Sequence, residues 1–166
     1  MTDTEHKLRA LRDQFDRAFA QPPAEAPPDQ AELLVVHVAE APYALRLDEL
    51  TGIEALGRVV PLPGAPPACL GLRGLRGQLV PVFSLGALLG RPSGRPAWLA
   101  LGRGAAEAPV GLAFDRLEGA RRVALAELAP ASGLGDWASV ALVDGARRVA
   151  VLRLSALFAR LTPEAV

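Results

Sequence analysis

The spacing of apolar and polar residues divides the chain into three parts. In residues 1–20, apolar side chains recur at intervals of three and four, which places them on one face of a helix. This spacing predicts a short amphipathic helix whose apolar face is Leu8, Leu11, Phe15 and Phe19. Residues 21–31 follow, and four prolines in the run QPPAEAPPDQ predict an extended, semi-stiff linker.

From residue 32 to residue 161, short stretches rich in Leu and Val alternate with turn residues, which is typical of an all-β domain. Arg76-Gly77 and Asp144-Gly145 each lie between two such stretches and predict hairpins. Leu85–Leu89 reads as a single helical turn that Ser84 can cap, and residues 153–161 read as a closing amphipathic helix. We expect about ten strands, at Leu33–Val38, Tyr43–Leu47, Ile53–Val60, Leu70–Leu75, Gln78–Phe83, Trp98–Leu101, Val110–Phe114, Leu117–Leu125, Trp137–Val143 and Arg147–Leu152.

Composition and charge narrow the range of functions. The chain has 166 residues and a formal net charge of zero, so neither nucleic acid nor an anionic membrane is indicated as a partner. The single cysteine, Cys69, excludes an intrachain disulfide and a cysteine metal cluster, and we expect it to lie in the core. The N-terminus is charged and lacks the apolar core of a signal peptide, so we expect a cytoplasmic protein.

Residues that could carry catalysis are scarce. His6 and His37 are the only histidines, and neither has neighbours at the spacing of a metal site or of a catalytic base. The glycine-rich run of residues 71–77 matches neither a phosphate-binding loop nor a dinucleotide-binding loop. We therefore expect no catalytic residues, no metal and no cofactor, although an enzyme with an unrecognised site is a remaining alternative.

Residues 71–90, GLRGLRGQLVPVFSLGALLG, resemble the signature of CheW-like domains, which runs roughly G-V-x-N-L-R-G-x-V-V-P-V-x-D-L. The match is ungapped, and the flanking residues agree with it. The segments from Tyr43 to Ile53, from Val59 to Pro67, from Gly111 to Asp115 and from Leu152 to Leu157 are also similar to family segments. The resemblance covers residues 32–161.

The resemblance implies a fold of two packed, five-stranded SH3-like barrels with short helices. The first barrel would span about residues 42–90, the second about residues 96–152, and the closing helix residues 153–161. It also implies a non-catalytic adaptor that couples the cytoplasmic tips of chemoreceptors to the regulatory domain of a CheA-type histidine kinase. The expected partner-binding residues are Leu50, Ile53, Leu75, Arg76, Gly77 and Val80.

Four positions depart from the family pattern. Gly74 replaces an Asn, Gly52 a Glu, Ser84 an Asp, and Arg153 an Asp. Gly52 and Gly74 remove a charge and an amide where the family faces its partners. The alternative function is therefore a divergent CheW-like interaction module, in a signalling system unconnected to motility, that has lost or changed one partner.

Alternatives also remain for single residues. Arg76 either binds a partner or braces its own turn, and Leu50, Ile53 and Val80 either line a groove between the barrels or belong to the core. The N-terminal helix docks either on its own barrel or on a partner, and we favour a partner or self-association contact because the proline linker separates the helix from the domain.

Overall fold

The computed structural model describes residues 29–91, 94–133 and 135–161. The predicted N-terminal helix and nearly all of the proline-rich linker lie outside these residues. Within them the chain is mostly β, as expected. The strands are β1 (Gln30–Val38), β2 (Ala41–Arg46), β3 (Gly52–Ala55), β4 (Cys69–Leu75), β5 (Gln78–Ser84), β6 (Trp98–Arg103), β7 (Pro109–Phe114), β8 (Arg116–Ala124), β9 (Leu128–Pro130), β10 (Ala138–Asp144) and β11 (Arg147–Leu152).

In the described residues, two short α-helices accompany the strands. Helix α2 (Leu85–Leu88) begins at Ser84, whose side chain accepts a hydrogen bond from the backbone N–H of Ala87 over 3.2 Å, which confirms the predicted cap. Helix α3 (Leu154–Leu161) is the predicted closing helix, and Leu154, Leu157 and Phe158 are its buried face. Four single turns of 3-10 helix lie at Leu47–Glu49, Ala105–Glu107, Leu125–Glu127 and Gly135–Trp137.

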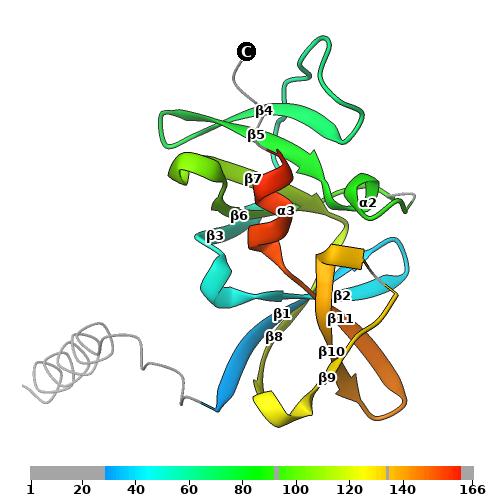
Figure 1. Ribbon diagram of the computed structural model, residues 1–166. Helices are drawn as coiled ribbons and strands as arrows, with labels where there is room; N and C mark the ends of the chain where they lie inside the picture. Colours follow the sequence, from blue (N-terminus) through cyan, green and yellow to red (C-terminus); the bar gives the residue numbers. More distant parts are fainter. Residues whose placement is uncertain (1–28, 92–93, 134, 162–166) are drawn as a thin grey trace, which may run out of the picture.

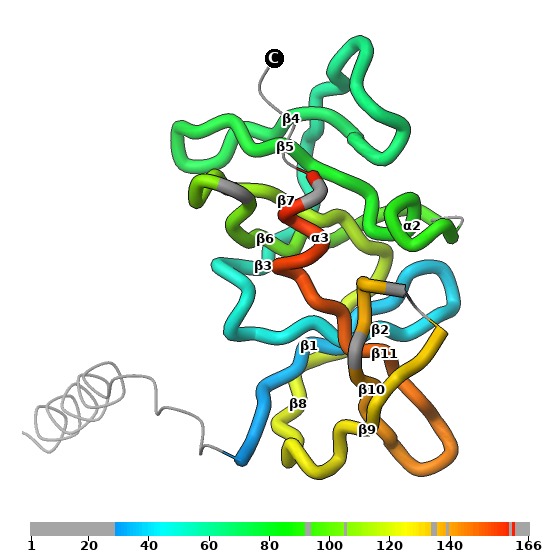
Figure 2. Tube along the Cα trace, viewed as in Figure 1, coloured from blue at the N-terminus to red at the C-terminus, as the bar shows by residue number. Residues whose placement is uncertain are grey.

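The strands form two sheets that lie one above the other in Figure 1. The five-stranded sheet has the order β3-β6-β7-β5-β4, and the six-stranded sheet has the order β8-β1-β2-β11-β10-β9. The sixth strand, β9, lies between the expected strands Leu117–Leu125 and Trp137–Val143, where none was expected; it is only three residues long and ends at Pro130. The tube in Figure 2 shows that the six-stranded sheet combines blue segments from the start of the domain with yellow and orange segments from its end.

The predicted residue ranges of the two barrels, about 42–90 and about 96–152, therefore differ from the strands that each sheet contains. Strand β2 pairs in parallel with β11, and β6 and β7 belong with β3–β5, so the five-stranded sheet spans residues 52–114. The six-stranded sheet takes residues 30–46 and 116–152. Pairing between strands more than 100 residues apart has no local signal in the sequence, whereas each hairpin has one.

Apolar residues alternate along the strands between two faces, and both faces are buried. One face of each sheet contributes to a shared cluster between the sheets, which also contains the buried face of α3. The other face encloses a smaller cluster belonging to that sheet alone. In β2, for example, Tyr43 and Leu45 lie in the shared cluster and Ala44 in the cluster of the six-stranded sheet. Burial on both faces explains why these strands read as almost continuous apolar runs.

The five-stranded sheet curls until its outer strands meet. Arg73 of β4 donates a hydrogen bond to the carbonyl of Ala55 over 2.8 Å and pairs with the carboxylate of Glu54 at 3.0 Å, both in β3. Val60 and Leu72 exchange two backbone hydrogen bonds of 2.8 Å next to this contact. These contacts close the sheet around its own cluster, as expected for a barrel.

Candidate functional site

The turn between β4 and β5 presents Arg76 to solvent. Leu75 pairs with Gln78, so the loop has two residues, and both have positive φ, 48° at Arg76 and 79° at Gly77. Two positive φ values define a type I′ turn, whose usual first residue is Asn, Asp or Gly. A long side chain in this conformation costs roughly 1 kcal/mol. Arg76 is exposed and forms no ion pair with any residue that the structure describes.

Gly71 brings a further segment against this hairpin. Its φ is 135°, the pairing of β4 with β5 shifts between Cys69 and Gly71, and a Cβ at Gly71 would lie 2.0 Å from the carbonyl oxygen of Val60. Glycine is therefore required for the segment around Val60 to pass beside β4. As a result, Val60 lies next to Leu72 and is 56% exposed.

One face of the hairpin is apolar and open to solvent. Paired residues of neighbouring antiparallel strands project from the same face, and Val60 pairs with Leu72, Leu72 with Pro81, and Gly74 with Leu79. Leu79 is 70% exposed, the largest value among the exposed large apolar residues. We call Val60, Leu72, Gly74, Leu79 and Pro81 the hairpin face.

The structure does not bring the predicted groove residues together. Leu50 and Ile53 are half-buried against the shared cluster between the sheets. Leu75 is half-buried against the cluster inside the five-stranded sheet, and Val80 is part of that cluster, only 1% exposed. The sequence marks all four positions as apolar but does not show which cluster each one packs against. Leu50 and Ile53 contact one cluster, and Leu75 and Val80 belong to another. Of the six predicted residues, Arg76 and Gly77 are exposed at the turn.

The glycines that replace family residues have room for a side chain. A Cβ at Gly74 would have no atom within 4 Å, and a Cβ at Gly52 would lie 3.5 Å from Leu101 Cδ1. Neither glycine has a positive φ. The backbone at both positions therefore does not require glycine.

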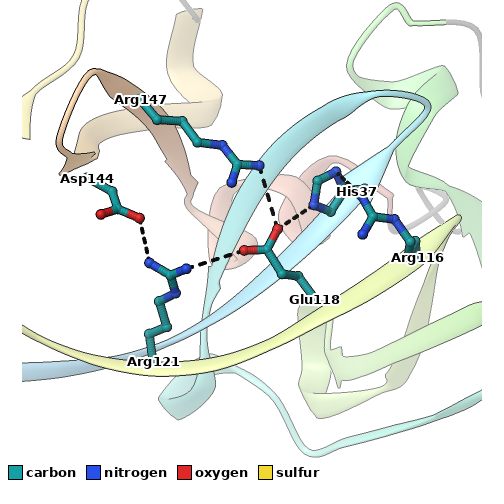
Figure 3. Close-up of polar contacts among 6 residues, drawn as sticks. All are labelled: His37, Arg116, Glu118, Arg121, Asp144 and Arg147. Atoms are coloured by element: carbon teal, nitrogen blue, oxygen red, sulfur yellow. Dashed lines mark hydrogen bonds and ion pairs between the residues drawn. The ribbon is translucent and has the colours of Figure 1, made fainter.

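A second cluster of polar side chains surrounds His37, which is 4% exposed at the end of β1. Figure 3 shows Glu118 of β8 between His37, Arg121 and Arg147. Nη2 of Arg116 lies 3.1 Å from Nδ1 of the imidazole. Because a guanidinium only donates, Nδ1 accepts, and Nε2 carries the proton that it donates to Glu118 over 2.6 Å.

This cluster is a brace of the six-stranded sheet. The hydrogen bond from His37, aided by Arg147 and Arg121, lowers the pKa of Glu118 against the opposing effect of burial. Arg147 lies 3.6 Å from Glu118, and Arg121 pairs with Asp144 at 2.6 Å, so β8 is tied to the β10–β11 hairpin, which is not its neighbour in the sheet. His37 therefore has a structural role. Its pairing with Glu118 could not be predicted from the sequence, because 81 residues separate the two.

An open cavity of about 320 Å³ lies beside this brace, between β8 and β10, and its charged lining is already engaged. Arg121 pairs with Asp144, Arg122 pairs with Glu32 at 2.6 Å, and Glu127 accepts a hydrogen bond from the backbone N–H of Ala124.

In the described part of the chain, no three His, Cys, Asp or Glu side chains are placed to hold a metal ion. Cys69 is half-buried against the shared cluster. No helix of the described residues is long and apolar enough to cross a membrane.

Comparison with known proteins identifies a family and structural relatives. Residues 32–162 match the family described as the CheW-like domain. The fold is similar to the crystal structure of the scaffolding protein TtCheW from Thermoanaerobacter tengcongensis, with a TM-score of 0.69 and 16% sequence identity over 77% of this chain and 92% of that one. The search of curated proteins found no match.

Proposed function

Since the chain belongs to the CheW-like domain family, we propose that it is a non-catalytic cytoplasmic adaptor that couples chemoreceptors to a CheA-type histidine kinase. An adaptor of this kind acts by binding several partners through its surface. Individually weak contacts are sufficient, because repetition in an assembly supplies the stability.

The observation that carries this proposal is the exposed guanidinium of Arg76 beside the hairpin face. The type I′ turn holds Arg76 in a conformation unfavourable to a long side chain, and no described residue pairs with its charge. Its five N–H groups are free to donate to carboxylates or carbonyls of a partner. The apolar side chains next to it would supply the area that a stable contact needs.

The experiment that tests the proposal is a titration of the purified chain with the purified regulatory domain of the CheA-type kinase from the same genome. We expect saturable binding, and we expect Arg76→Glu to weaken it about tenfold or more while the fold remains intact. Arg148→Glu is the matched control, because Arg148 is also exposed but lies in β11 of the other sheet. Equal effects of the two substitutions would contradict a role for Arg76.

A second candidate function follows from Gly52 and Gly74. These glycines remove a charge and an amide that the family presents to its partners, and the backbone at both positions needs no glycine. We propose as the alternative a divergent CheW-like interaction module of a non-motility signalling system that has lost or changed one partner. Binding of the kinase domain without binding of a chemoreceptor tip from the same genome would favour this alternative.

A further inference from the structure

Nothing in the chain's own fold requires glycine at position 74, in contrast to several other glycines of the domain. At Gly71 a Cβ would collide with the carbonyl of Val60, at Gly102 with Phe158 and at Gly111 with Leu99, and Gly77 has a φ of 79°. At Gly74 the φ is ordinary, and no atom lies within 4 Å of a built Cβ. Glycine in a strand costs stability relative to alanine, and one purpose of such a residue is the close approach of another molecule.

The missing side chain leaves a gap in the hairpin face. Leu79 stands across from Gly74 on β5, and Leu72 precedes it by two residues on the same face of β4. Both neighbours are apolar, and Leu79 is 70% exposed. The Gly74 gap is therefore an open position with apolar sides on an exposed sheet surface.

The unpaired charge in the segment that carries the gap is positive. Residues 56–83 contain three arginines and no Asp or Glu. Arg73 is neutralised by Glu54, whereas Arg58 and Arg76 have no ion pair with the residues that the structure describes. A partner surface that complements this region carries carboxylates next to an apolar side chain.

We propose that the Gly74 gap receives a large apolar side chain, Leu or aromatic, from a segment of the kinase regulatory domain, with a carboxylate of the same segment bound by Arg76. Gly74 is then a specificity-determining residue that this chain has in place of the family's Asn. The inference rests on the proposed adaptor function and specifies the chemistry of the partner.

The test uses the full chain and the purified kinase regulatory domain as the probe, with binding followed by calorimetry and folding by the melting temperature. Gly74→Leu fills the gap, Gly74→Asn restores the family residue, and Gly74→Ala adds one methyl group. Gln78→Leu is the control. Gln78 pairs with Leu75 and therefore lies on the opposite face of the same hairpin, so this substitution adds an apolar side chain away from the gap.

We expect Gly74→Leu and Gly74→Asn to weaken binding about tenfold and Gly74→Ala less, with melting temperatures equal to or above that of the unchanged protein. Gln78→Leu leaves binding unchanged. If Gly74→Asn binds the kinase domain with unchanged or higher affinity while Arg76→Glu still weakens binding, the proposed role of the Gly74 gap is wrong and the adaptor function is not contradicted. Loss of self-association in the Gly74 variants, with kinase binding intact, assigns the gap to a second copy and also overturns the proposal. Failure of the unchanged chain to bind the kinase domain overturns the adaptor function and the gap together.

Discussion

The imidazole of His37 donates a hydrogen bond from Nε2 to Oε2 of Glu118 over 2.6 Å, across 81 residues of chain. His37 is buried, and the side chain of Glu118 is 25% exposed. The bond joins β1 to β8 where β8 also meets the turn of the β10–β11 hairpin. It is the centre of the brace that holds the six-stranded sheet together at this end.

The brace predicts a dependence of stability on pH. The pKa of Glu118 in the folded protein lies below its ordinary value of 4.5, so its ionised form stabilises the fold at neutral pH. This contribution is lost as the pH falls from about 4.5 through the lower, folded value. We expect Glu118→Gln to reduce the free energy of unfolding by about 1–3 kcal/mol at neutral pH, and the difference from the unchanged protein to shrink in acid.

Urea denaturation of both proteins over a range of pH measures this difference. Glu40→Gln serves as the control, because Glu40 is exposed and forms no ion pair with the described residues. A constant difference between Glu118→Gln and the unchanged protein at every pH would exclude an ionic contribution from Glu118.

The second prediction concerns the docking of α3. A Cβ at Gly102 would lie 2.2 Å from Cε2 of Phe158, so the helix packs directly on the backbone of β6. We expect Gly102→Ala to lower the free energy of unfolding by about 1–3 kcal/mol, as overpacking does. Gly52→Ala is the matched control, because its Cβ meets Leu101 at an ordinary 3.5 Å. Equal stability of the two variants in urea denaturation would show that α3 shifts without cost.

The third prediction separates binding by Arg76 from bracing of its turn. Asn-Gly is the preferred pair for a type I′ turn, so Arg76→Asn retains the turn and removes the guanidinium. We expect a melting temperature equal to or above that of the unchanged protein, and binding of the kinase regulatory domain weakened about tenfold. Full affinity in this variant would assign Arg76 to the turn alone.

The fourth prediction concerns the N-terminal segment. Asp29 accepts a backbone hydrogen bond from Leu125 over 2.8 Å, so a deletion of residues 1–28 leaves the start of the domain in place. We propose that Leu8, Leu11, Phe15 and Phe19 contact a partner, and we expect the deletion to weaken partner binding without lowering the melting temperature. A large drop in melting temperature with binding retained would indicate docking on the chain's own domain.

Local signals in the sequence predicted much of the fold. The Arg76-Gly77 turn, the Ser84 cap and the apolar face of α3 lie where they were expected. The second hairpin turn is displaced by one residue, because Asp144 pairs with Arg147 and Gly145-Ala146 form the loop. These features depend on a few neighbouring residues, which is why the sequence could reveal them.

Features that depend on the curvature of the sheets were not predictable in the same way. Whether Ile53 and Leu75 face one groove depends on which cluster each strand face meets, and that is decided only when both sheets close. The side chains that make up the hairpin face come together because Gly71 admits the segment at Val60, a contact with no pattern of its own in the sequence.

The parallel pairing of β2 with β11 has a consequence for synthesis on the ribosome. When residue 114 has been added, all strands of the five-stranded sheet are present, but only β1 and β2 of the six-stranded sheet. The five-stranded sheet can form at this point, whereas the six-stranded sheet cannot be completed until residues 116–152 have been added. Until those residues are added, the apolar faces of β1 and β2 stay uncovered and their edges unpaired, which favours aggregation of the nascent chain at this stage.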